Sequence, residues 1–273
     1  MANPIIGSPE AFTRHGAPQQ GYAQQGYAQQ PGFGTDPYQQ QAPYEQQLPT
    51  GAVMTLDDVI AKTAITLGTV AAVAAVTFML IPPALLMPVW IAAAIAGFIT
   101  VLVVSRQAKV SIGGVMFYAV VEGLFVGAIS AYFNFVFPGI IAPAVLATFV
   151  TAGVTLAAYK FFNIRVTPKF RKVVFIGTAA LAATYLVNLV LSLFGINTGI
   201  IEIGSGAGPL AIGISVVAVV LAVLSLIADF DSVERGIAAQ APAQESWRAA
   251  LGITVTMVWL YLEILRIMSY FRD

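Results

Sequence analysis

The chain has 273 residues, of which 58% are hydrophobic and only 10% charged, and its mean hydropathy is +0.83. This composition excludes an ordinary soluble enzyme. Thirteen basic residues balance thirteen acidic ones, which argues against nucleic acid as a partner, and the absence of cysteine excludes disulfides and thiolate metal sites. The only histidine, His15, lies near the N-terminus, so catalysis by histidine is excluded as well, and we expect no enzymatic activity and no bound cofactor.

Residues 1–50 differ in composition from the rest of the chain. They are rich in Gln, Tyr, Gly, Pro and Ala and contain the direct repeat GYAQQ at 21–25 and 26–30. Such a segment cannot bury a hydrophobic core, so we expect a disordered cytoplasmic tail without a signal peptide. The tail either binds a partner or is solvated without a specific role. The remaining residues, 51–273, form the predicted membrane domain.

Seven apolar segments follow the tail, and Pro, Gly, Asn and charged clusters separate them. Each has about 20 residues, the length that crosses the hydrocarbon core of a bilayer. The predicted spans are 62–81, 84–105, 111–133, 140–159, 173–194, 210–229 and 247–270. The sequence therefore predicts an all-α polytopic membrane protein with seven transmembrane helices.

The positions of the basic residues predict the orientation of these spans. Ten basic residues lie beside the first span or in the second–third, fourth–fifth and sixth–seventh links: Lys62, Arg106, Lys109, Lys160, Arg165, Lys169, Arg171, Lys172, Arg235 and Arg248. The three links on the other face contain none. Because cytoplasmic loops are enriched in Lys and Arg, we expect a cytoplasmic N-terminus and an external C-terminus.

Ionisable residues inside a membrane are costly, so each one is a candidate functional residue. Glu122 lies near the middle of the third span, where Gly123 and Gly127 form a small-residue stripe that allows close helix packing. Glu122 has no partner within its own span. It either supports or lines a pore, or makes a structural hydrogen bond to another helix.

Asp229 and Asp231 lie at the cytoplasmic end of the sixth predicted span. They are two residues apart and point to different faces of a helix, so only one of them can face the bundle interior squarely. Asp231 is either a supporting residue of the site or part of a solvated helix end.

Two further candidates are basic. Arg266 lies three residues after Glu263 in the seventh span, so the two either belong to a functional site or form an ion pair that lowers the cost of insertion. Arg106, at the cytoplasmic end of the second span, is either an ordinary membrane anchor or a latch that binds Asp229.

Carboxylates in this setting suit Ca²⁺ or protons. Two carboxyl groups close together in a low-dielectric interior share a proton, because two like charges repel there. A protonated pair would hold two helices together, and an ionised pair would separate them or bind a cation.

The chain from about Met54 onward resembles the transmembrane Bax inhibitor motif family, in particular its bacterial members. The residues that carry the resemblance are IPPALLMP at 81–88, Glu122-Gly123 with Gly127, the Asp229 segment, and Leu260-Tyr261-Leu262-Glu263. The resemblance implies seven helices with a central one, in the bacterial inner membrane, and a pH-dependent Ca²⁺ leak controlled by two acidic residues. By position these acids are Asp229 and Glu263, with Arg106 near the latching arginine.

The distance along the chain between Asp229 and Glu263 affects whether these two acids can pair. At about 1.5 Å per residue, a seventh helix that begins at Trp247 places Glu263 roughly 24 Å along it, too far to reach Asp229 at the end of the sixth span. Either the helix begins near Thr254, or it is broken, or the two acids do not pair. Glu263 also replaces the aspartate usual in the family, and the second span carries no acid.

Two functions from different classes follow from the sequence. The first is a pH-sensitive calcium leak channel with Asp229 and Glu263 as its ion-binding sensor, Glu122, Asp231, Arg106 and Arg266 in support, and Ca²⁺ and protons as its ligands. The second is a membrane scaffold that regulates another membrane protein, such as a membrane protease, and uses the tail for that contact.

Overall fold

The computed structural model describes residues 52–162, 164–196 and 198–272. The predicted tail, 1–50, lies outside these residues. The described part is all-helical, and its helices are α2 (Leu56–Leu80), the 3₁₀ turn η1 (Pro83–Leu85), α3 (Leu86–Arg106), α4 (Ile112–Val136), α5 (Ile141–Phe161), α6 (Pro168–Leu193), α7 (Pro209–Ala238) and α8 (Glu245–Ser269). Seven of these are long and apolar enough to cross a membrane, which confirms the predicted fold class.

Local chemistry fixes where several helices begin. The side chains of Thr55, Ser111 and Thr167 each accept a hydrogen bond from the backbone N–H three residues later, at 3.2 Å, and so cap α2, α4 and α6. Pro168 and Pro209 occupy the first turns of α6 and α7, where a missing N–H costs nothing. These caps satisfy backbone donors that the helices leave unpaired.

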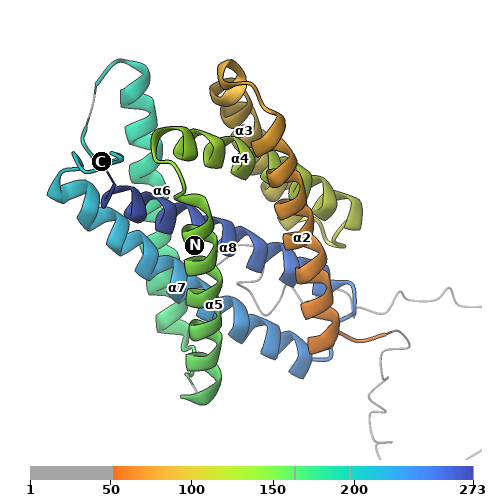
Figure 1. Ribbon diagram of the computed structural model, residues 1–273. Coiled ribbons are helices and arrows are strands. Elements are labelled where there is room, and N and C mark those ends of the chain that lie inside the picture. The colour runs from red at the N-terminus through yellow and green to blue at the C-terminus, as the bar shows by residue number, and fades with distance from the viewer. Residues whose placement is uncertain (1–51, 163, 197, 273) are drawn as a thin grey trace, which may run out of the picture.

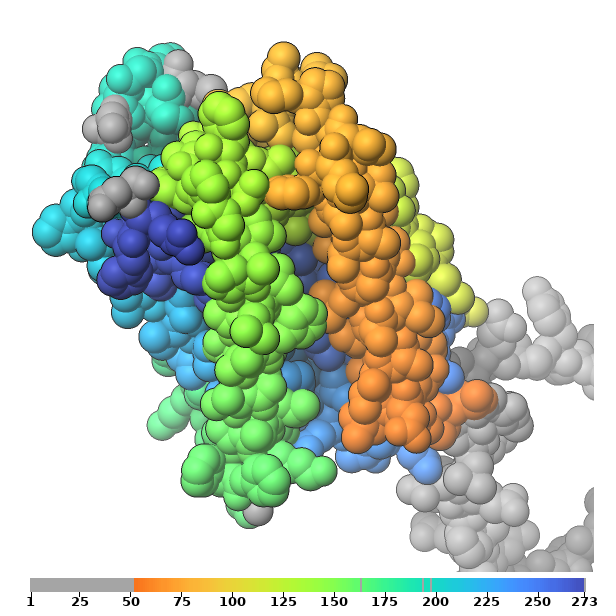
Figure 2. Space-filling model, viewed as in Figure 1, coloured from red at the N-terminus to blue at the C-terminus, as the bar shows by residue number. Residues whose placement is uncertain are grey.

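α8 is the most buried of the seven helices and runs through the middle of the bundle (Figure 1). It contacts α2, α4, α5 and α7, while α3 packs on α4 and α6 packs on α7. In the space-filling view, part of α8 is visible between α5 and α2 (Figure 2). The outer helices expose large apolar side chains such as Phe98, Leu146 and Val173, as expected of surfaces that face lipid.

Three predicted boundaries differ from the structure by five residues or more. α2 begins at Leu56 rather than at residue 62, and α6 begins at Pro168 rather than at residue 173. The prediction that the sixth span ends at Asp229 places the helix end too early, because α7 continues to Ala238. A change from apolar to charged residues marks where a helix leaves lipid, not where its backbone hydrogen bonds end, so these helices extend into their charged flanks.

The two ends of the bundle carry different links. We call the basic end the one that holds the links after α3, α5 and α7, and the far end the one that holds the links after α2, α4 and α6. At the basic end, the segment before α2 pairs with the link between α7 and α8: Met54 N–H donates to Ala241 O at 2.7 Å, and Ala243 N–H donates to Ala52 O at 2.9 Å. This contact ties the start of the membrane domain to the start of α8.

Candidate functional site

Asp229 lies inside the bundle, between α7 and the central helix α8. Its side chain is buried, and the Thr256 hydroxyl donates a hydrogen bond to its Oδ2 at 2.6 Å. Asp229 lies about 14 Å from the end of α7, given 1.5 Å per residue. Of the two aspartates in this segment, Asp229 is therefore the one that faces the central helix.

Asp231 faces α6. It forms an ion pair with Arg171, and a second one with Arg235 Nε at 3.1 Å. Nearby, the Tyr159 hydroxyl of α5 donates to Glu234 Oε2 at 2.6 Å. This group joins α5, α6 and α7 at the basic end, so Asp231 belongs to a contact between helices rather than to a solvated helix end.

Glu263 lies on α8 near the far end and is 1% exposed. Arg266 Nη2 donates to its Oε2 at 2.5 Å, and its Oε1 accepts from the Tyr185 hydroxyl at 3.2 Å and from Trp259 Nε1 at 3.3 Å. The same Arg266 nitrogen donates to the Tyr185 hydroxyl at 2.9 Å. Glu263 and Arg266 thus form the ion pair that was one of the two interpretations from the sequence, and Tyr185 of α6 completes the cluster.

The structure does not bring Asp229 and Glu263 together. Asp229 contacts α8 at Thr256, which lies about 10 Å before Glu263 along the helix axis. α8 begins at Glu245 and is continuous to Ser269, so neither a late start nor a break brings Glu263 back toward Asp229. Of the three alternatives from the spacing, the separation of the two acids is the one observed.

Glu122 lies between α3 and α4. A Cβ added at Gly97 of α3 would lie 3.1 Å from Glu122 Oε2, and Tyr118, one turn earlier on α4, faces the same carboxyl group. The lack of a side chain at Gly97 therefore leaves the space that the Glu122 carboxyl occupies.

Arg106 does not reach Asp229. It is exposed at the end of α3, and within the described part of the chain its side chain makes no hydrogen bond or ion pair. Arg248, at the start of α8, binds this end of α3 instead: its Nη1 and Nη2 donate to the backbone oxygens of Ser105 and Gln107 at 3.0 and 2.9 Å. Of the two interpretations of Arg106, the latch on Asp229 is thus not formed, because Arg106 is exposed while Asp229 is buried.

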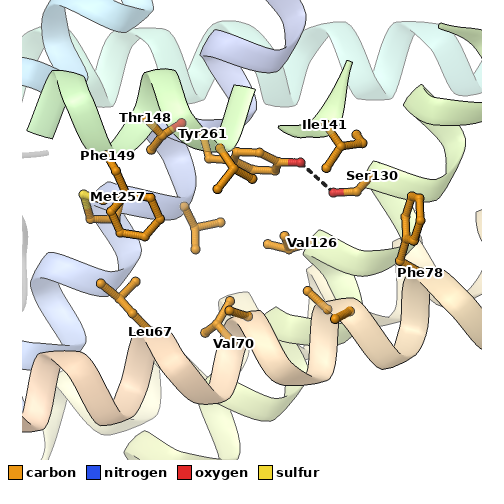
Figure 3. A pocket seen from close by; sticks show the side chains of 15 residues that line it. Leu67, Val70, Phe78, Val126, Ser130, Ile141, Thr148, Phe149, Met257 and Tyr261 are labelled. Carbon is orange, nitrogen blue, oxygen red and sulfur yellow. Dashed lines mark hydrogen bonds between the residues drawn. The ribbon is translucent and has the colours of Figure 1, made fainter. Parts of the chain in front are cut away.

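A mostly apolar cavity of 320 Å³ lies between α2, α4, α5 and α8 (Figure 3). Two of its polar atoms bond to each other, since the hydroxyls of Ser130 and Tyr261 lie 2.7 Å apart. Figure 3 shows this pair on one wall and apolar side chains such as Leu67, Val70 and Phe149 around the rest. A lining of this kind has few oxygen atoms that could bind a cation.

Sequence reasoning named Arg171 only as a basic residue of a link. It did not single out four uncharged residues of these clusters, namely Thr256, Tyr185, Trp259 and Tyr159. Uncharged polar side chains are common in membrane helices, so nothing in the sequence separates them from their neighbours. Within the described ranges, no group of three or more His, Cys, Asp or Glu side chains could hold a metal ion.

Seven long apolar helices with ionisable side chains buried among them define a multi-pass membrane protein. A family model described as Bax inhibitor 1 like matches residues 3–273, nearly the whole chain. The chain belongs to the Bax inhibitor 1-like family. No curated protein matches it.

Proposed function

We propose that this protein is a pH-sensitive cation leak channel of the cell membrane, with Ca²⁺ as its permeant ion. The observation that supports this function best is the burial of Asp229 between α7 and the central helix. A carboxylate in such a place is costly unless it is compensated, and membrane carboxyl groups of this kind mark ion and proton pathways.

Asp229 is the residue that we propose as the pH sensor. In its neutral form, the carboxyl group accepts the Thr256 hydrogen bond and α7 stays against α8. Ionisation places a negative charge on Asp229, which is only 1% exposed in the contact between α7 and α8. The charge is stabilised when water or a cation reaches it, so ionisation favours separation of α7 from α8. We expect flux to rise with pH.

Glu263 has a different role in this proposal. Its carboxylate is already matched by Arg266 at 2.5 Å, so its charge is compensated within α8. We propose that this ion pair keeps α8 in register with Tyr185 of α6, and that Glu122 supports the pathway between α3 and α4.

Ca²⁺ flux into liposomes at pH 6, 7 and 8 tests the proposal. The wild-type protein should show flux that increases with pH, and Asp229→Asn should remain at the low level at every pH, because Asn imitates the neutral acid. Asp57→Asn, a change at an exposed aspartate of α2, is the matched control and should behave as wild type. Retention of the full pH response by Asp229→Asn would refute the sensor.

Absence of flux above that of empty liposomes would refute the channel itself. The alternative from the sequence, a scaffold that uses residues 1–50 to contact another membrane protein, would then be the better hypothesis. Its test is the loss of that contact when the tail is deleted.

We further propose that the basic end faces the cytoplasm, because it holds most of the Lys and Arg residues. The chain has no cysteine, so single cysteines report orientation directly. An impermeant maleimide should label Ser205→Cys, at the exposed far end, in intact cells. Ala239→Cys, at the exposed basic end, should be labelled only after permeabilisation. The reverse pattern would show the opposite orientation.

A further inference from the structure

A second cavity, of 630 Å³, lies toward the far end of the bundle. Its walls come from α3, α4, α6, α8 and the link before α7. Most of the lining is apolar or aromatic: Met87, Trp90, Ile129, Tyr132, Phe133 and Leu181. Cavities of this size and lining in other proteins hold drug-sized apolar ligands.

Two buried side chains of this lining carry a donor that has no partner among the described residues. Arg266 is 8% exposed, and within the described part of the chain its Nη1 has no hydrogen-bond partner, although its Nη2 bonds to Glu263 and Tyr185. Thr178 of α6 is 7% exposed, and no described residue bonds to its hydroxyl either. Buried polar groups are normally paired, so two unpaired ones on one cavity indicate a missing acceptor.

Charge restricts what this acceptor can be. Glu263 lines the same cavity and already neutralises Arg266. An anionic ligand would add a net negative charge to an apolar site beside this carboxylate, which is unfavourable. A neutral carbonyl oxygen accepts hydrogen bonds without that cost.

The position of the cavity indicates how a ligand would reach it. Met87 and Ile201, which line the cavity, are 55% and 43% exposed, so the cavity opens at the surface of the helical bundle. In the cavity lining, the rings of Trp90 and Tyr132 stack with centroids 6.3 Å apart. This surface is apolar, which favours a ligand that arrives from the lipid phase.

We propose that this cavity binds an uncharged, lipid-soluble molecule with a carbonyl group, to which Arg266 and Thr178 donate hydrogen bonds. Two classes of molecule carry this chemistry, the acyl ester of a neutral lipid and a quinone. The proposal concerns binding only and does not depend on ion flux.

Tryptophan quenching tests the proposal on the full-length protein in detergent. Two of the three tryptophans, Trp90 and Trp259, line the cavity, and Trp247 lies at the basic end, with the Lys62 ammonium 5.4 Å from its ring. A Trp247→Phe background therefore reports on the cavity alone. The probes are a monoacylglycerol with a brominated chain, the corresponding brominated fatty acid at pH 8, the brominated alcohol, and a decyl benzoquinone.

We expect saturable quenching by the monoacylglycerol, by the quinone or by both, which identifies the class, and weaker quenching by the acid and the alcohol. Thr178→Val removes an unpaired hydroxyl and should fold normally, yet weaken binding of the carbonyl probes about fivefold. Arg266→Lys keeps a charge beside Glu263 but loses the second nitrogen, and should weaken binding about tenfold.

Thr184→Val is the matched control on α6, since Thr184 is half-buried and lies outside the cavity lining. It should bind all probes as the background protein does. Equal quenching by all four probes, or quenching that Thr178→Val and Arg266→Lys leave unchanged, would overturn the proposal. Absence of saturable quenching would overturn it as well.

Discussion

An Arg248→Met variant is expected to lose about 3–5 kcal/mol of stability, because removing one partner of a buried ion pair leaves the other charge uncompensated. Arg248 and Glu245 are both buried at the start of α8, with Nε and Oε2 2.6 Å apart. The same guanidinium group also binds the last backbone oxygens of α3. Thermal unfolding in one detergent should show a Tm lower by roughly 10 °C.

Two variants control this prediction. The double variant Glu245→Gln/Arg248→Met removes both charges and should lose less than Arg248→Met alone, because no buried charge is left unpaired. Arg106→Met changes an exposed arginine at the same end of α3 and should leave the Tm almost unchanged. A double variant less stable than the single one, or an equal loss in Arg106→Met, would contradict the role assigned to Arg248.

A Gly127→Ala variant should separate α2 from α4. A Cβ at position 127 would lie 2.6 Å from both Ala74 O and Thr77 Cβ, closer than real Cβ atoms approach, and Ala74 O belongs to the backbone of α2. The helices must therefore move apart, and overpacking of this kind costs about 1–3 kcal/mol. The measurement is Tm in detergent, beside the wild-type protein.

Gly153→Ala is the matched control for this change. Gly153 lies on α5, and a Cβ there would meet nothing within 4 Å, so this variant should be as stable as wild type or slightly more stable. Gly123→Ala, whose Cβ would lie 2.6 Å from Val73 Cβ, should behave like Gly127→Ala. If Gly127→Ala and Gly153→Ala had the same Tm, close packing of α2 on α4 would not limit stability.

These stability variants and the flux variant act on separate parts of the molecule. Asp229 lies between α7 and α8, and neither Arg248 nor Gly127 is bonded to it through the hydrogen bonds described. The Asp229→Asn variant should therefore lose flux and keep the Tm of the wild-type protein. A large fall in Tm in that variant would mean that the loss of flux reports unfolding.

Much of the candidate site follows from charge and hydropathy. Glu122, Asp229, Glu263 and Arg266 stand out because so few ionisable residues lie within apolar segments. The ion pair between Glu263 and Arg266 could be predicted from their spacing, since residues three apart share a helix face. Thr256, which bonds to Asp229, and Arg171, which pairs with Asp231, lie on other helices, and a single sequence contains no information about which helices pack together.

The length and composition of the apolar segments determined that this chain forms seven membrane-spanning helices, because a bilayer of fixed thickness demands about 20 apolar residues per span. The tertiary structure decided which side chains lie beside the charged residues of those helices. It placed Thr256 rather than Glu263 beside Asp229, and Arg248 rather than Arg106 at the junction of α3 and α8. Hydropathy depends on each residue alone, whereas a contact depends on the rotation and depth of two helices, which only their packing fixes.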